Sequence, residues 1–239
     1  MSKISFGSRR AGWLTAAAAG LFVSMALVAL LDFSPPLAVP PALAEAIGYL
    51  VVFIPLVAAI TFATLFRGQR SLARDFGFSA TWTDVVLGVA LGLALRVAGM
   101  WFEVAMYGIR LNGGSTGIPR AQWLAWVLLA VIAPIILAPL IEELFFRGLV
   151  LRGLLRWGTR RTLSPRLSAV VAIVVSSLIF MLVHLIGVHS PRQVILIGVM
   201  TFVVGCTAAV MAVKTGRLGA SFALHMTYNA TILIPALLA

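Results

Sequence analysis

The stretch "LAPLIEELFFRGLV", residues 137–150, places Glu142, Glu143 and Arg147 inside an otherwise apolar segment. A charge left unpaired in the middle of a membrane helix costs about 2.5–3.5 kcal/mol, so all three side chains need a partner or water. On a helix, Glu143 and Arg147 lie four residues apart on one face, which predicts an ion pair. Glu142 points about 140° away from Arg147. The spacing therefore leaves Glu142 as a carboxylate in need of another partner.

Two histidines and an asparagine in later apolar segments are the candidate partners. His184 stands in "FMLVHL", and His225 and Asn229 stand four residues apart in "HMTYNA", so that their side chains share one helix face. The segments that contain Glu142 and His184 are expected to be antiparallel about a turn near residue 163, and each residue is 21 positions from that turn. We therefore expect Glu142 and His184 at a similar depth. His189 falls in a loop.

These residue types are suited to hydrolysis by general-base catalysis. Glu142, in low-dielectric surroundings, would take a proton from a water molecule that His184 helps to position. His225 and the Asn229 amide would stabilise the oxyanion that forms when this water attacks a carbonyl. Two other interpretations stay open, namely a purely structural Glu143–Arg147 pair and a transporter that relays protons through buried Glu and His.

The same side chains also bear on whether a metal is involved. Glu142, His184 and His225 could supply the N/N/O ligands of zinc or another divalent metal ion. No HExxH helix is present. We therefore expect that the chemistry requires no cofactor, and the metal remains the alternative.

The composition shows which elements must position these groups. Of 239 residues, 62% are hydrophobic and 10% are charged, and the mean hydropathy is +1.08, which is typical of a polytopic membrane protein. A single cysteine, Cys206, excludes a disulfide framework and a Cys-based zinc site. The net charge of +11 comes from short basic clusters between apolar runs, which favours membrane orientation over nucleic-acid binding.

The apolar runs predict an all-α bundle of about seven spans, with eight possible because Pro134 and Pro139 can bend or split the fourth. Thirteen of the 18 Lys and Arg residues fall on the side of the N-terminus, which is therefore predicted to be cytoplasmic, and three (Arg110, Arg120 and Arg192) fall on the other. Arg96 and Glu103, two turns apart, are predicted to pair. The predicted spans cover residues 11–32, 46–66, 84–107, 122–157, 167–187, 193–213 and 219–238.

One point of geometry conflicts with a shared site. Counted from the loops, His184 lies near the outer end of the fifth span and His225 near the inner end of the seventh, a difference of roughly 10 Å for straight helices. We therefore expect a re-entrant segment at "IGVHSPRQ", residues 186–193, or a strongly tilted sixth span. We also expect a water-filled cavity that is reached from the cytoplasmic side.

Three short motifs together resemble a known family. "EELFFR" (Glu142, Glu143, Arg147), "FMLVH" (Phe180, His184) and "HMTYN" (His225, Asn229) are similar to the EExxxR, FxxxH and HxxxN motifs of the CAAX protease and bacteriocin-processing enzyme family, also called the Abi family, which includes the Ras-converting CAAX prenyl endopeptidases. The resemblance covers residues 120–238. Residues 1–119 match only as membrane helices, so we divide a single transmembrane domain, 1–239, into N-terminal helices and a catalytic core.

The resemblance implies an intramembrane endopeptidase that cleaves near the cytoplasmic face. Glu142 with His184 would activate water, His225 and Asn229 would form the oxyanion hole, and Glu143, Arg147 and Phe180 would support them. Members have been described both as zinc metalloproteases and as glutamate-dependent proteases, and some as noncatalytic immunity or scaffold proteins, which is the chief alternative.

The compact chain, the short loops and the absence of organelle-targeting signals favour a bacterial plasma membrane. The expected partners are the lipid bilayer and a peptide or membrane-protein substrate, without nucleic acid. The sequence leaves open the oligomeric state and whether the substrate is prenylated.

Overall fold

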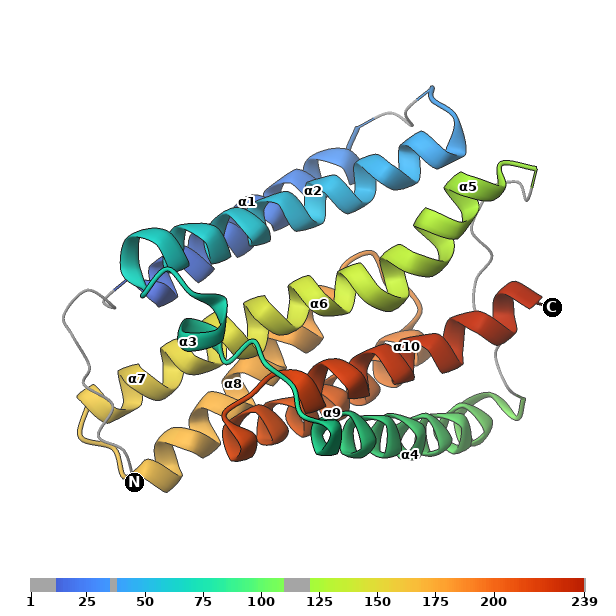
Figure 1. The fold of residues 1–239 in the computed structure, drawn as a ribbon. Helices are drawn as coiled ribbons and strands as arrows, with labels where there is room; N and C mark the ends of the chain where they lie inside the picture. Colours follow the sequence, from blue (N-terminus) through green and yellow to red (C-terminus); the bar gives the residue numbers. More distant parts are fainter. Residues whose placement is uncertain (1–11, 35–37, 110–120, 239) are drawn as a thin grey trace.

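A computed structural model describes residues 12–34, 38–109 and 121–238 of the chain (Figure 1). Five of the sixteen basic residues counted above for orientation lie outside these residues, namely Lys3, Arg9, Arg10, Arg110 and Arg120. The described residues form helices and no strand, which confirms the predicted all-α fold. In chain order the helices are α1 (Trp13–Asp32), α2 (Pro41–Phe62), η2 (Ala63–Arg67), α3 (Leu72–Phe76), α4 (Trp82–Tyr107), α5 (Trp123–Trp126), η3 (Val127–Leu137), α6 (Ala138–Glu142), η4 (Glu143–Leu151), α7 (Arg152–Arg160), α8 (Pro165–His184), α9 (Pro191–Thr215) and α10 (Gly219–Leu238).

Length and hydropathy identify six helical segments in the described residues that can cross a membrane. They correspond to the first six predicted spans. The seventh prediction coincides with α10, which is also 20 residues long, but its polar residues His225, Thr227, Tyr228 and Asn229 interrupt its apolar character. The chain is therefore a multi-pass membrane protein.

The predicted fourth span is one continuous helical segment of 38 residues, Trp123–Arg160, referred to below as the long helix. Pro134 and Pro139 do not split it. Two stretches of it, η3 and η4, are π-helical, a wider winding in which an N–H bonds the carbonyl five residues earlier. Ala138, for example, donates to Ala133 O. Pro134 lies within η3 and Pro139 within the α-helical α6, so the chain stays helical through both prolines.

The long helix runs through the bundle between two groups of helices (Figure 1). α1 and α2 pack against each other on one side of it, and α4 and α10 pack against each other on the other. α8 and α9 form a further antiparallel pair that contacts η4. The close packing of α4 on α10 requires glycine, because a Cβ at Gly92 would lie 2.7 Å from Leu224 O. Within the long helix, all nine residues of η4 are buried among these neighbouring helices.

Aromatic side chains fill the bundle where α1 begins and α3 ends. Trp13 and Phe76 lie with ring centroids 5.0 Å apart, and both are at most 1% exposed. A Cβ at Gly148 would lie 2.9 Å from Phe76 Cβ, so α3 packs directly on η4. This end also carries the arginines that follow η4, and we call it the arginine end (Arg152, Arg156, Arg160, Arg161 and Arg166).

The turn between α9 and α10 lies deeper in the bundle than the turn between α7 and α8. The Arg152 guanidinium donates to Gly216 O at 2.7 Å, eight residues before α7 ends at Arg160. Eight helical residues correspond to about 12 Å. Because the turn before α10 lies deeper, the second turn of α10, which contains His225, lies closer to the level of Glu142. The expected re-entrant segment is not formed, since residues 185–190 are a short link and α9 is an uninterrupted helix.

Candidate active site

Glu143 and Arg147 form a buried ion pair at the start of η4. The Glu143 Oε1 and Arg147 NH1 atoms lie 2.9 Å apart, and the two side chains are only 2% and 1% exposed. The Arg147 guanidinium also lies 4.3 Å from the ring centroid of Phe180 and donates to Gly205 O at 3.4 Å. The i,i+4 pair expected from the sequence is present, and it is additionally tied to α8 and α9.

His225 contacts the same carboxylate from α10, a contact that the sequence did not indicate. Its Nδ1 lies 3.0 Å from Glu143 Oε1, and the imidazole is buried. Because an ionised carboxylate only accepts hydrogen bonds, Nδ1 is assigned as the donor. The other ring nitrogen, Nε2, faces Glu142 with its Oε2 at 3.7 Å. One imidazole therefore lies between the two adjacent glutamates.

His184 approaches Glu142 from α8. Its Nε2 lies 3.9 Å from Glu142 Oε2, and its Nδ1 lies 2.7 Å from the carbonyl oxygen of Phe180. Since that carbonyl only accepts, Nδ1 carries the hydrogen and Nε2 of the neutral ring has a free lone pair. Both histidine contacts of Glu142 exceed hydrogen-bond length and suit a bridging water. The structure thus brings together Glu142, His184 and His225.

Asn229 lies one turn beyond His225 on α10, but its side chain is bonded to the long helix. Its Nδ2 donates to Pro134 O at 3.0 Å. A primary amide has two N–H groups, so one remains for a further acceptor. The structure thus brings Asn229 to Pro134 and not to the carboxylate of Glu142, which His184 and His225 face.

Phe180 packs against several of these side chains. It is 1% exposed, and its ring centroid lies 4.4 Å from that of His184 and 5.6 Å from that of His225. Phe146 meets it edge-on at 5.1 Å. The ring therefore fixes both imidazoles and the Arg147 guanidinium by contact rather than by any chemistry of its own.

Glu142 and His184 line a cavity of about 250 Å³ between α1, α2, the long helix and α8. α1 contributes Leu21, Met25 and Val28 to it, two to four turns beyond Trp13. These lining residues lie away from the arginine end, which the sequence assigns to the cytoplasm. Trp13 and Phe76, which fill the bundle at the arginine end, do not line the cavity, and its expected opening toward the cytoplasm stays a prediction.

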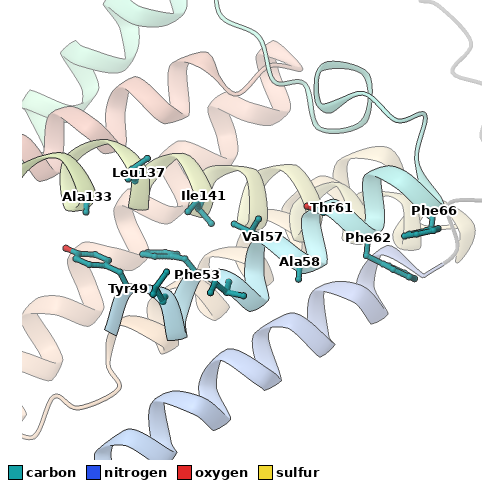
Figure 2. A pocket seen from close by; sticks show the side chains of 12 residues that line it. Tyr49, Phe53, Val57, Ala58, Thr61, Phe62, Phe66, Ala133, Leu137 and Ile141 are labelled. Carbon is teal, nitrogen blue, oxygen red and sulfur yellow. The ribbon is translucent and has the colours of Figure 1, made fainter. Parts of the chain in front are cut away.

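A larger apolar groove of about 620 Å³ runs along the neighbouring face of the long helix. Figure 2 shows side chains of α2 facing those of η3 and α6 across it, with Tyr49 at one end and Phe66 at the other. Ile141, the residue before Glu142, lines the groove. Its lining is almost entirely hydrocarbon, which suits a lipid-like or apolar ligand.

The same side chains bear on the metal alternative. Among the residues that the structure describes, no group of three or more His, Cys, Asp or Glu side chains is assembled as a metal site. Glu142 Oε2 is 3.7 and 3.9 Å from the two imidazole nitrogens, and two ligand atoms that each lie about 2.0–2.2 Å from one zinc ion can be that far apart. These two distances therefore give no argument against a shared metal, and the metal alternative stays a prediction.

Comparison with known proteins gives one match. The family model described as type II CAAX prenyl endopeptidase, Rce1-like, matches residues 123–231, slightly less than half of the chain. This segment contains the long helix, α8, α9 and most of α10, and hence Glu142, His184 and His225. No curated protein and no solved structure matches the chain.

Proposed function

Because residues 123–231 are a domain of the Rce1-like type II CAAX prenyl endopeptidase family, we propose that the chain is an intramembrane endopeptidase in which Glu142 activates the attacking water. The proposal is carried by one observation. Glu142 Oε2 faces two imidazole nitrogens at 3.7 and 3.9 Å inside a cavity, while the adjacent Glu143 is committed to Arg147 and His225. Of the two glutamates, Glu142 is the one placed to exchange a proton.

In the proposed reaction, His184 positions a water molecule, and the Glu142 carboxylate takes a proton from it. The water oxygen forms a bond to the scissile carbonyl carbon, and the carbonyl π electrons move to its oxygen. The tetrahedral intermediate then collapses, the C–N bond breaks, and Glu142 returns its proton to the leaving amine. The products are a carboxylate and an amine, and the enzyme is regenerated without a covalent intermediate.

The oxyanion requires donors, and this defines the protonation state of His225. Its Nδ1 hydrogen is directed at Glu143, so Nε2 can donate only when the ring is an imidazolium. The buried Glu143 carboxylate, 3.0 Å away, stabilises that cation. We assign the oxyanion hole to Nε2–H of the charged His225 and to the second N–H of Asn229.

We propose that the scissile bond lies inside the membrane rather than at its cytoplasmic surface. Glu142 precedes Arg152, the first residue of the arginine end, by ten residues, which is about 15 Å at the rise of an α-helix and supports a site well inside a hydrocarbon core of about 30 Å. We propose that the groove beside Ile141 receives the apolar part of a membrane-embedded peptide or lipidated protein (Figure 2). A bacterial plasma membrane is the proposed location.

The experiment compares membranes that contain the wild-type chain with membranes that contain Glu142→Gln. Peptide termini are labelled and identified by mass spectrometry after incubation. Endopeptidase activity predicts new termini in the wild-type sample that are missing from the Glu142→Gln sample. The control is Glu45→Gln, a change at an exposed glutamate of α2, which should give the same termini as the wild type. Identical sets of termini in wild type and Glu142→Gln would contradict the proposal and favour a binding or scaffold role.

A further inference from the structure

Pro134 and Pro139 remove two hydrogen-bond donors from the long helix, five residues apart. In a π-helix such as η3 the carbonyl of one residue pairs with the N–H five residues later, as Ala133 pairs with Ala138. By this pattern the donor for Leu129 O would be residue 134, and the donor for Pro134 O would be residue 139. Both positions are proline and have no N–H. By this pattern, the carbonyls of Leu129 and Pro134 are therefore left without an intrahelical donor.

Side chains from two other helices contact these two carbonyls. The Tyr49 hydroxyl, on α2, donates to Leu129 O at 3.2 Å, and the Asn229 amide, on α10, donates to Pro134 O at 3.0 Å. Figure 2 shows Tyr49 at the end of the groove, next to the long helix at Ala133. A carbonyl freed in apolar surroundings must find a donor. Each proline thus provides an acceptor for one neighbouring helix.

We propose that Tyr49 and Asn229 are positioning residues that lock the long helix between α2 and α10 through the carbonyls freed by the two prolines. Asn229 is one turn from His225, and Pro134 is eight residues before Glu142. The bond between Asn229 and Pro134 therefore fixes how α10 and the long helix lie along each other, and with it the separation of His225 from Glu142. The catalytic consequence rests on the proposed function, whereas the lock itself does not.

Tyr49 also lines the apolar groove, so its removal could act on substrate instead. A proline-to-alanine change separates the two effects, because it returns the missing N–H. In Pro134→Ala, Leu129 O regains an intrahelical donor and no longer depends on Tyr49. In Pro139→Ala, Pro134 O regains one and no longer depends on Asn229. The lock therefore predicts a specific pairing of each donor with one proline.

The first test is a set of double-mutant cycles in thermal unfolding of the purified protein in detergent. Tyr49→Phe is expected to lower Tm by roughly 2–4 °C in the wild-type background and to leave Tm unchanged in Pro134→Ala. Asn229→Ala is expected to behave in the same way with Pro139→Ala. The control is Pro55→Ala, in α2, which should leave the effects of Tyr49→Phe and Asn229→Ala unaltered. Equal Tm losses in the proline and alanine backgrounds would overturn the lock.

The second test measures peptide cleavage for the Tyr49 pair. The lock predicts that Tyr49→Phe lowers kcat at constant KM and that Pro134→Ala added to it restores kcat. A higher KM in both backgrounds would overturn the positioning role of Tyr49 in favour of a substrate contact. Asn229 is judged by Tm alone, because the same side chain is assigned to the oxyanion. If the wild-type protein cleaves nothing, the proposed function fails while the Tm cycles still decide the lock.

Discussion

Glu142 Oε2 lies 3.7 Å from His225 Nε2, although the two residues come from helices on either side of α8 and α9 in the sequence. The other nitrogen of the same ring lies 3.0 Å from Glu143. His225 therefore separates the functions of two adjacent carboxylates. Glu143 holds one side of the imidazole and Arg147, while Glu142 remains available in the cavity.

This division predicts that loss of Glu143 harms the fold more than loss of Glu142. Glu143→Gln removes the charge that neutralises Arg147, whose side chain is 1% exposed, and an uncompensated buried charge costs about 3–5 kcal/mol. We expect a large fall in Tm in detergent, measured by thermal unfolding. Glu143→Leu combined with Arg147→Met should recover part of the loss, because no charge is then left unpaired. A Tm for Glu143→Gln equal to that of the wild type would refute the structural role.

His184 is expected to matter for the reaction and little for stability. Its side chain is 31% exposed at the cavity, in contrast to the 4% of His225. His184→Ala should lower kcat by roughly 10²–10⁴-fold through loss of water positioning, with an unchanged unfolding temperature. The comparison with His189→Ala, in the link between α8 and α9, controls for the general effect of removing a histidine. Full activity of His184→Ala would remove this residue from the site.

The packing of α4 on α10 should affect the site, although α4 lies outside the matched segment. A Cβ at Gly92 would lie 2.7 Å from Leu224 O, directly before His225, whereas a Cβ at Gly48 in α2 meets nothing within 4 Å. Gly92→Ala is expected to cost about 1–3 kcal/mol by overpacking and to lower activity. Gly48→Ala should be neutral or stabilising by up to about 1 kcal/mol, as is usual for this change in a helix. Equal unfolding free energies for the two variants would show that α10 tolerates displacement.

The glutamate mechanism also predicts the response to chelators. Cleavage in liposomes should continue at the same rate after incubation with EDTA or phenanthroline, and added zinc should not increase it. A loss of activity that zinc restores would show that the reaction needs a metal ion, with Glu142, His184 and His225 as the expected ligands, and would replace the mechanism proposed above.

Much of the site could be predicted because its signals are local. Spacing along one helix correctly paired Glu143 with Arg147 and also Arg96 with Glu103, whose charged atoms lie 2.7 Å apart. Counting from one turn correctly brought Glu142 and His184 together, 3.9 Å apart, although the nine residues of η4 between Glu142 and α7 are π-helical. Each of these inferences needed only the rise and periodicity of an α-helix.

The remaining features depend on relations between helices. The predicted difference in depth between His184 and His225 assumed that all turns on one side of the membrane lie at one depth. The contact of Arg152 with Gly216 O shows that they do not. The bond of His225 to Glu143 had no sequence signal, because Arg147 already satisfied that carboxylate. Pro134 and Pro139 favour a bend, yet the helix continues through both of them. The carbonyls of Leu129 and Pro134 accept hydrogen bonds from Tyr49 and Asn229, which lie in helices remote in sequence.

The central claim is that Glu142, and no other carboxylate of the chain, activates the water. The most direct measurement is the rate of peptide-bond cleavage by purified Glu142→Gln in liposomes, with its Tm determined on the same sample and Glu45→Gln measured in parallel. The mechanism predicts a wild-type Tm and a rate reduced at least about 10²-fold for Glu142→Gln, with Glu45→Gln unaffected. A folded Glu142→Gln protein that cleaves at the wild-type rate would contradict the mechanism.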